Sequence, residues 1–260
     1  MEINIKKDPF ELGKEAGKVA AELIQEAISK KGYANIILAT GASQFETLNQ
    51  LVSEKKIDWS KVVMFHLDEY IDLPATAYAS FRKYLRERFL EKVSPLKAVH
   101  LIDGEAEPEA ECKRLGVLID DHPIDVALVG IGENGHLAFN DPPADFQTET
   151  PYMVVELDEL CRKQQLAEGW FNSLEEVPTK AISMSIRQIM KSKNIICSVP
   201  DERKARAVKN CLEHLPNKMY PASILQQHPS CKFYFDKSSA ALLSEEILVK
   251  IANSEFTLIN

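Results

Sequence analysis

The chain has 260 residues, of which 45% are hydrophobic and 27% are charged, the proportions of an ordinary globular protein rather than a disordered one. Its 31 Lys and Arg residues against 39 Asp and Glu residues give a net charge of −8, which excludes nucleic-acid binding through a strong positive field. No apolar run approaches the about 20 residues that a membrane span requires.

The amino-terminal segment and the cysteines both indicate a cytoplasmic protein. The segment MEINIKKDPF lacks the apolar core of a signal peptide. The 5 cysteines form no C-x-x-C pair, so we expect reduced, mostly buried thiols rather than disulfides or a cysteine-rich zinc site. They are Cys112, Cys161, Cys197, Cys211 and Cys231.

The first helix is expected to begin after Asp8, with Pro9 at its first position and Glu11 completing a capping box. Apolar residues then recur at helical spacing over Leu12–Ala27, and Gly32 is the expected end of the helix.

Strands and helices are expected to alternate after this helix, with the first strand near residue 35. Such alternation predicts a mostly parallel sheet with helices on both faces. No flexible linker is visible, so the whole chain, 1–260, is expected to be a single domain. The predicted strands are 35–39, 62–67, 98–102, 125–129, 194–198 and 232–235. The predicted helices are 43–53, 80–92, 107–119, 158–171, 201–214 and 238–252.

Ligands bind at the carboxyl ends of the strands in such folds, and the first of these ends reads Thr40-Gly41-Ala42-Ser43. Backbone N–H groups of this turn, with the hydroxyls of Thr40 and Ser43, could hold a phosphate or a carboxylate. The alternative is that Ser43 only caps the following helix. It is not a Walker motif, because no G-K-[ST] follows.

The strand predicted at 62–67 is followed by Asp68, Glu69 and Tyr70. A partly buried carboxylate at this position could act as a general base. His66 and Asp68 could share a strand face as metal ligands, but two ligands without a third are a weak signal. On this segment alone, a solvated acidic loop is the simpler interpretation.

The third strand end, after residue 129, is a glycine-rich loop. Gly130, Gly132 and Gly135 formally match G-x-G-x-x-G, but the long helix of a dinucleotide site does not follow. His136 lies five residues before Asp141, and a histidine beside a carboxylate can exchange protons near neutral pH. A purely structural histidine is the alternative.

A basic helix start follows the strand predicted at 194–198. Lys204, in the first turn, would point back to the same edge of the sheet and could neutralise an anion there. In isolation, a solvated helix start is the better explanation.

Taken together, these segments resemble the glucosamine-6-phosphate deaminase (isomerase) family, which belongs to a superfamily with 6-phosphogluconolactonase. The resemblance spans nearly the whole chain, and the tract from Gly135 to Asn140 favours the deaminase branch over the G-H-T-A-S of the lactonases. It implies an α/β fold, a Rossmann-like three-layer sandwich. The segments that carry it are Thr40–Ser43, Leu67–Tyr70, Ser80–Phe81, Gly130–Pro142, Val177–Pro178, Lys204–Ala205 and Ser223–Pro229.

The resemblance further implies that an amino-hexose 6-phosphate is converted to a ketose 6-phosphate and ammonia, without a metal or an organic cofactor. His136 would handle the proton of the ring oxygen and open the sugar ring, with Asn134 and Asp141 flanking it. Asp68 would then carry the C2 proton to C1. The phosphate would sit on the turn after the first predicted strand, together with Lys204.

Two departures from the family pattern bear on this assignment. The family histidine is often flanked by two acids, whereas Asn134 stands here in place of the first. The family also often has an Arg before a Phe-Phe pair that contacts the phosphate, and no Arg occurs at 164–172. Arg162 replaces it only if the local geometry differs, and Trp170 is interpreted as shaping a distinct sugar pocket. Galactosamine 6-phosphate, or another hexosamine phosphate, is therefore an alternative substrate.

Two other functions stay open. A lactonase of the same superfamily would use the phosphate site and the loop histidine but would activate water. A non-catalytic sensor would bind a sugar phosphate without turnover, although no helix–turn–helix precedes the predicted fold and the acidic charge disfavours DNA. The expected partner is a small sugar phosphate, with no nucleic acid and no membrane. A homo-oligomer is expected because the family is often oligomeric.

Overall fold

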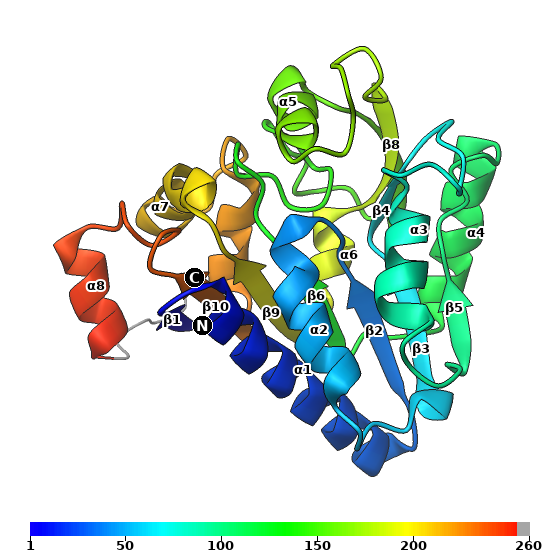
Figure 1. Cartoon of the computed structure of the whole chain (residues 1–260), viewed down its shortest axis with the longest axis horizontal. Coiled ribbons are helices and arrows are strands. Elements are labelled where there is room, and N and C mark those ends of the chain that lie inside the picture. Colours follow the sequence, from blue (N-terminus) through cyan, green and yellow to red (C-terminus); the bar gives the residue numbers. More distant parts are fainter. Residues whose placement is uncertain (254–260) are drawn as a thin grey trace.

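The computed structural model describes residues 1–253, and seven strands within them form one sheet. The strands are β1 (Glu2–Lys6), β2 (Ala34–Leu38), β3 (Val62–His66), β5 (Ala98–His100), β6 (Val126–Val129), β9 (Asn194–Val199) and β10 (Cys231–Asp236). Their order is β1-β10-β9-β6-β2-β3-β5, and every neighbouring pair is parallel (Figure 1). The predicted α/β sheet is therefore confirmed.

Helices cover both faces of this sheet, which makes three layers. Successive side chains of a strand point to opposite faces, so Ile36 and Leu38 of β2 enter one apolar core while Ile37 enters the other. Three helices pack on the first core: α1 (Pro9–Lys31), α2 (Phe45–Ser53) and α3 (Phe81–Leu85). Four pack on the second: α4 (Pro108–Asp120), α6 (Ile186–Met190), α7 (Ala205–Glu213) and, through Ile247, α8 (Glu245–Ala252).

A smaller antiparallel sheet, which the sequence did not predict, adjoins the site. Its strands are β4 (Asp68–Tyr70), β8 (Lys180–Met184) and β7 (Tyr152–Glu156), in the order β4-β8-β7. Because β4 follows β3 after a single residue, it starts at the carboxyl edge of the large sheet. In Figure 1, β8 and the helix α5 (Glu159–Ala167) stand at the top of the view, beyond that edge.

Some predicted boundaries were wrong. The strand near residue 35 is not the first, because β1 precedes it at the edge of the large sheet. The helix expected at 238–252 is only α8 (Glu245–Ala252), because Asp236 and Ser239 exchange side-chain and backbone hydrogen bonds and form a turn instead. The helix expected at 80–92 continues α3 as a π-helix over Arg86–Leu90.

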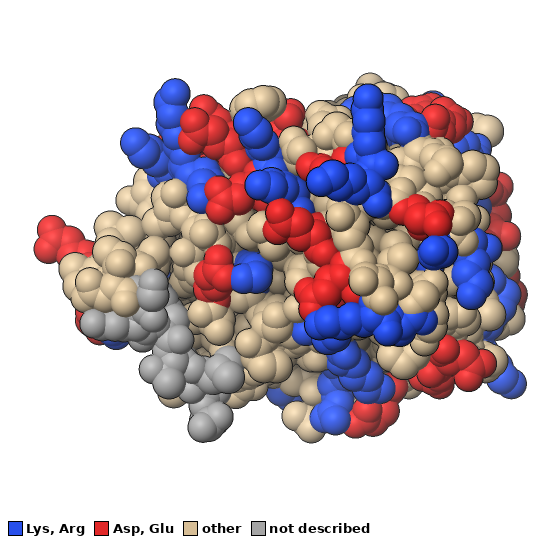
Figure 2. Space-filling model, turned by 90° about the horizontal axis from the view of Figure 1, so that it is seen from below, with Lys and Arg blue, Asp and Glu red and all other residues tan. Residues whose placement is uncertain are grey.

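The surface carries mixed charge. Figure 2 shows Lys and Arg side chains interspersed with Asp and Glu over one face of the molecule, rather than gathered by sign. Among residues 1–253, no helix is both long and apolar enough to cross a membrane.

Glycine allows the close packing of α1 on α2. A Cβ added at Gly13 of α1 would lie 2.2 Å from the Cβ of Glu46, so one of the two helices would have to shift. We predict that Gly13→Ala lowers the free energy of unfolding by about 2 kcal/mol.

Gly116→Ala in α4 is the matched control, since its Cβ would meet Pro151 at an ordinary 3.7 Å. It should leave stability unchanged or raise it by about 0.5 kcal/mol, because alanine favours the helix. Urea unfolding of both variants checks the pair, and equal effects would contradict the packing argument.

Candidate active site

A cavity of about 60 Å³ lies where the strands of the large sheet end. Six segments reach it: the turn after β2, the junction of β3 and β4, the start of α3, the loop after β6, helix α5 and the helical turn after β9. The structure thus brings together most of the residues that the sequence singled out. These are Thr40, Gly41, Ala42, Ser43, Asp68, His136 and Lys204.

The turn after β2 is fixed to the neighbouring strands by one buried amide. Gln44 donates hydrogen bonds from Nε2 to the backbone oxygens of Val129 and Ser198, at 3.3 and 3.4 Å, and to Ser43 Oγ at 3.1 Å. Residues 42–44 form a 3₁₀ turn before α2, so Ser43 does not cap that helix. Ser43 lines the cavity instead, and its Oγ accepts the hydrogen bond from Gln44.

Asp68 presents a buried carboxylate without a hydrogen-bond donor. It is 6% exposed, and no group of residues 1–253 donates a hydrogen bond to it. Burial, with a smaller contribution from the adjacent Glu69, raises the pKa of Asp68 to about 8. Such a carboxyl can exchange a proton near neutral pH, which suits a general base that faces a cavity.

Glu69, the next residue, differs from Asp68 because its carboxylate is fully hydrogen-bonded to the protein. Its carboxylate accepts hydrogen bonds from the backbone N–H groups of Tyr70, Phe81 and Arg82, at 2.9, 3.2 and 2.7 Å, and from the Ser80 hydroxyl. It therefore holds the start of α3 against β4.

His66 belongs to the core rather than to a metal site. It is fully buried in β3, and its Nδ1 accepts a hydrogen bond from the Ile102 N–H. Burial lowers its pKa to about 3, so it is neutral.

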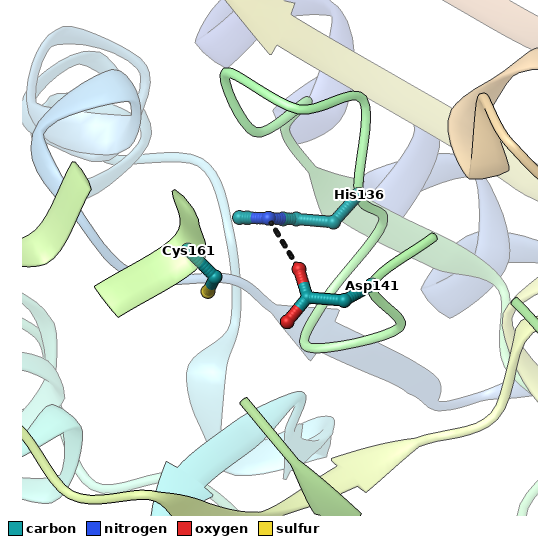
Figure 3. A group of neighbouring side chains, drawn as sticks. All are labelled: His136, Asp141 and Cys161. Atoms are coloured by element: carbon teal, nitrogen blue, oxygen red, sulfur yellow. Dashed lines mark ion pairs between the residues drawn. The ribbon is translucent and has the colours of Figure 1, made fainter. Parts of the chain in front are cut away.

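The His136 ring packs directly on Gly132. A Cβ at Gly132 would lie 2.2 Å from the ring, so only glycine permits this position of the imidazole. Asp141 Oδ1 lies 3.2 Å from Nδ1. Figure 3 shows the ring edge-on with the carboxylate to one side of its plane, and Nδ1 makes no directed hydrogen bond. The contact between His136 and Asp141 is therefore electrostatic, and the Nδ1 atom of His136 has no hydrogen-bond partner.

Asn134 connects the loop to α5. Its Nδ2 donates to Asp141 Oδ1 at 2.9 Å and to Asp158 Oδ2 at 3.2 Å, while its Oδ1 accepts from the His136 N–H. An aspartate here would face two carboxylates of like charge, so the local electrostatics favour the amide.

One group of the described residues could share a metal ion. Ligand atoms of His136, Asp141 and Cys161 lie within 4.8 Å of one another (Figure 3). Burial, and then Asp141 and Asp158, raise the pKa of the Cys161 thiol well above its usual value, so it is a protonated and weak ligand. The Asp141 oxygens already accept hydrogen bonds from Asn134 and from the Asp158 N–H. The absence of a metal stays a prediction.

Helix α5 contributes residues that the sequence reasoning missed. Gln164, Gln165 and Glu168 line the cavity, and Glu168 Oε1 lies 3.6 Å from Lys204 Nζ. Burial lowers the pKa of Lys204, although the Glu168 carboxylate acts in the opposite direction. The spacing of Gln164 and Glu168, four residues apart, was a usable signal, because it places both on one helix face.

Neither Arg162 nor Trp170 lines the cavity. Arg162 does not reach the cavity, since its guanidinium donates to the backbone oxygens of Leu174 and Val177. Trp170 is not a wall of the pocket either. It packs against Phe45 and Tyr84 and donates a hydrogen bond to Glu168 Oε2 at 3.1 Å.

Comparisons with known proteins agree with this geometry. The model of a family described as glucosamine-6-phosphate isomerases/6-phosphogluconolactonase matches residues 7–233. Curated proteins named glucosamine-6-phosphate deaminase, from Bacillus thuringiensis and Bacillus anthracis, are 36% identical over 248 residues, 95% of this chain and 91% of theirs.

Solved structures give the same result for the fold. One described as a monomeric glucosamine-6-phosphate deaminase is 31% identical with a TM-score of 0.86, over 93% of this chain and 100% of that one. A 6-phosphogluconolactonase from Trypanosoma brucei is 19% identical with a TM-score of 0.74, over 94% and 98%, and shares the fold alone.

The environment of Asp68 predicts a stability effect. The folded pKa of about 8 lies above the value near 3.9 of an unfolded chain, so the Asp68 contribution to stability falls as pH rises between the two. Asp68→Asn removes the buried charge. We expect it to raise the melting temperature by about 5 °C at pH 9 and by less at pH 6. Calorimetry at the two pH values checks this, and a variant that melts lower at both would contradict it.

Proposed function

The chain belongs to the family of glucosamine-6-phosphate isomerases and 6-phosphogluconolactonases, and we propose that it converts an amino-hexose 6-phosphate to a ketose 6-phosphate and ammonia. The observation that carries the proposal is the placement of Asp68. A carboxylate without a donor, whose pKa is near neutral, faces the same cavity as His136 and the turn after β2. A reaction that moves a proton between two carbons needs such a base.

Proton transfer at C2 requires an open-chain sugar, because the C2–H bond is acidic only beside a free carbonyl. In the proposed reaction His136 carries the proton of the ring oxygen, which opens the ring. Two observations support that role: the imidazole packs closely on Gly132, and the Asp141 carboxylate lies beside it.

Asp68 would then remove the C2 proton and return it to C1. The double bond moves to give a C2 iminium and a hydroxyl at C1. A water molecule then adds to C2 to form a carbinolamine, which expels ammonia and leaves a ketone whose oxygen comes from the water. Asp68 must be ionised to accept the proton and neutral to return it, and a pKa near the working pH favours both halves of the cycle.

The phosphate would bind the turn Thr40–Ser43 and Lys204. The turn supplies hydroxyls and backbone N–H groups, and Lys204 supplies a positive charge at the same wall of the cavity. In a chain with a net charge of −8, these directed groups must provide the attraction for an anionic substrate.

Ammonia release tests the proposal. Glucosamine 6-phosphate and galactosamine 6-phosphate are assayed side by side, with 6-phosphogluconolactone hydrolysis as the competing activity. We predict ammonia from at least one amino sugar, and a kcat lowered about 1,000-fold or more in Asp68→Asn, which cannot accept the proton.

Asp121→Asn, an exposed carboxylate at the end of α4, is the matched control and should keep full activity. Folded wild-type chain that releases no ammonia from either sugar would overturn the deaminase assignment, and enzymatic lactone hydrolysis would then replace it.

The pH dependence of kcat/KM provides a second test. Asp68 is mostly protonated below its pKa of about 8 and cannot act as a base there. We predict a kcat/KM that rises about tenfold per pH unit below pH 7 and levels off above pH 8. Initial rates measured from pH 5 to 9 would reveal this rise in kcat/KM. A profile already flat from pH 5 would show that an ordinary, solvated carboxylate is the base.

A further inference from the structure

The proposed phosphate subsite already contains an anion, the carboxylate of Glu168. Its Oε1 lies 3.6 Å from Lys204 Nζ, and both side chains are 5% exposed. Its Oε2 lies close to the turn after β2, 4.0 Å from the position of a Cβ at Gly41. The carboxylate therefore lies between the cation and the turn that would bind a phosphate.

This position of the carboxylate is held by specific hydrogen bonds. Gln164 Nε2 donates to Oε1 at 2.8 Å, and the Trp170 indole N–H donates to Oε2 at 3.1 Å. Trp170 is itself packed against the rings of Phe45 and Tyr84. Glu168 is thus a built part of the cavity rather than a mobile surface side chain.

A phosphate cannot simply be added beside Glu168. Lys204, the one cationic side chain among the described residues that line the cavity, is already paired with Glu168. A dianionic group would enter a site whose cation is neutralised and whose carboxylate would repel it. The cavity of about 60 Å³ is also far below the roughly 300 Å³ of a small-molecule site.

We propose that Glu168 is an internal anion that occupies the phosphate subsite in the free chain and must be displaced by the phosphate of the substrate. This inference rests on the proposed sugar-phosphate substrate and extends it. Displacement frees Lys204, and it moves Glu168 and Gln164 out of the cavity together, since both lie on one face of α5. Ligands with a strong dianionic group then bind, while neutral sugars do not overcome the Lys204–Glu168 pair. Glu168 is in this way a specificity-determining residue.

The test uses inorganic phosphate as the probe, because its binding needs no turnover. Isothermal calorimetry compares the wild-type chain with Glu168→Gln, which keeps the shape of the side chain but removes its charge. We expect phosphate to bind about tenfold more tightly to the variant, because the state in which the Glu168 carboxylate occupies the subsite no longer competes with phosphate. If the chain turns over a sugar phosphate, its KM should fall by a similar factor.

Glu159→Gln is the matched control. Glu159 lies on the same helix and pairs with Lys163, but its side chain is 66% exposed and lies outside the cavity lining. The Glu159→Gln substitution removes the same charge and should leave phosphate affinity unchanged. An equal gain in Glu159→Gln would mean that net charge alone is responsible, and this would overturn the proposal.

Trp170→Phe keeps the ring packing but removes the N–H donor that holds Glu168, so it should also tighten phosphate binding. It serves as the test if Glu168→Gln does not fold. Phosphate should in addition change the fluorescence of Trp170 in the wild-type chain, since the chain has 2 tryptophans and the other, Trp59, is buried in the core.

The outcomes separate this inference from the proposed function. Unchanged or weaker phosphate binding by Glu168→Gln would overturn it, and weaker binding would mean that Glu168 contacts the ligand. Absence of phosphate binding in all variants would overturn it too. Tighter binding by the variant without ammonia release from any amino-hexose 6-phosphate would leave it standing and remove only the deaminase reaction.

Discussion

The parallel pairing of β2 with β6 and of β6 with β9 is the constraint on which the site depends. Parallel strands end at the same edge of a sheet, so segments far apart in the sequence meet there. Beyond the strand ends, the pairing of the strands no longer fixes the distances between the segments that follow them. The Gln44 amide takes over this role, because it binds the backbone oxygens of Val129 and Ser198 at once. The turn that we propose to bind the phosphate is therefore placed by the sheet itself.

Asp68 and Glu69 show that the environment of a carboxylate, rather than its residue type, decides whether it stabilises the fold or is available to a ligand. Both are buried at the start of β4, and successive residues of a strand face opposite sides. Glu69 faces the start of α3, where backbone N–H groups and Ser80 satisfy its oxygens. Asp68 faces the cavity, where nothing in residues 1–253 does so. The small antiparallel sheet makes this division possible, because its pairing with β8 keeps β4 extended.

The ends of β2, β3 and β6 were predictable from the sequence, since buried apolar runs followed by Gly or acidic residues mark them. The helix start at Asp8 was also predictable from its capping box. The antiparallel sheet was not, because β4 has only three residues and β7 is half-buried, which leaves a weak alternation pattern. The contact of Glu168 with Lys204 depends on where α5 packs, and helical periodicity contains no such information.

The departures of this chain from its family pattern have a common electrostatic basis. Asn134 is neutral where an acid is frequent, and it bridges Asp141 and Asp158 at the start of α5. At the other end of the same helix, Glu168 supplies a negative charge to a segment without the family's Arg. Helix α5 is thereby tied to the body of the protein at both ends by polar contacts to the site's own residues. In the proposed reaction, a substrate whose phosphate binds Lys204 would replace one of these contacts, so phosphate binding would be coupled to the position of α5.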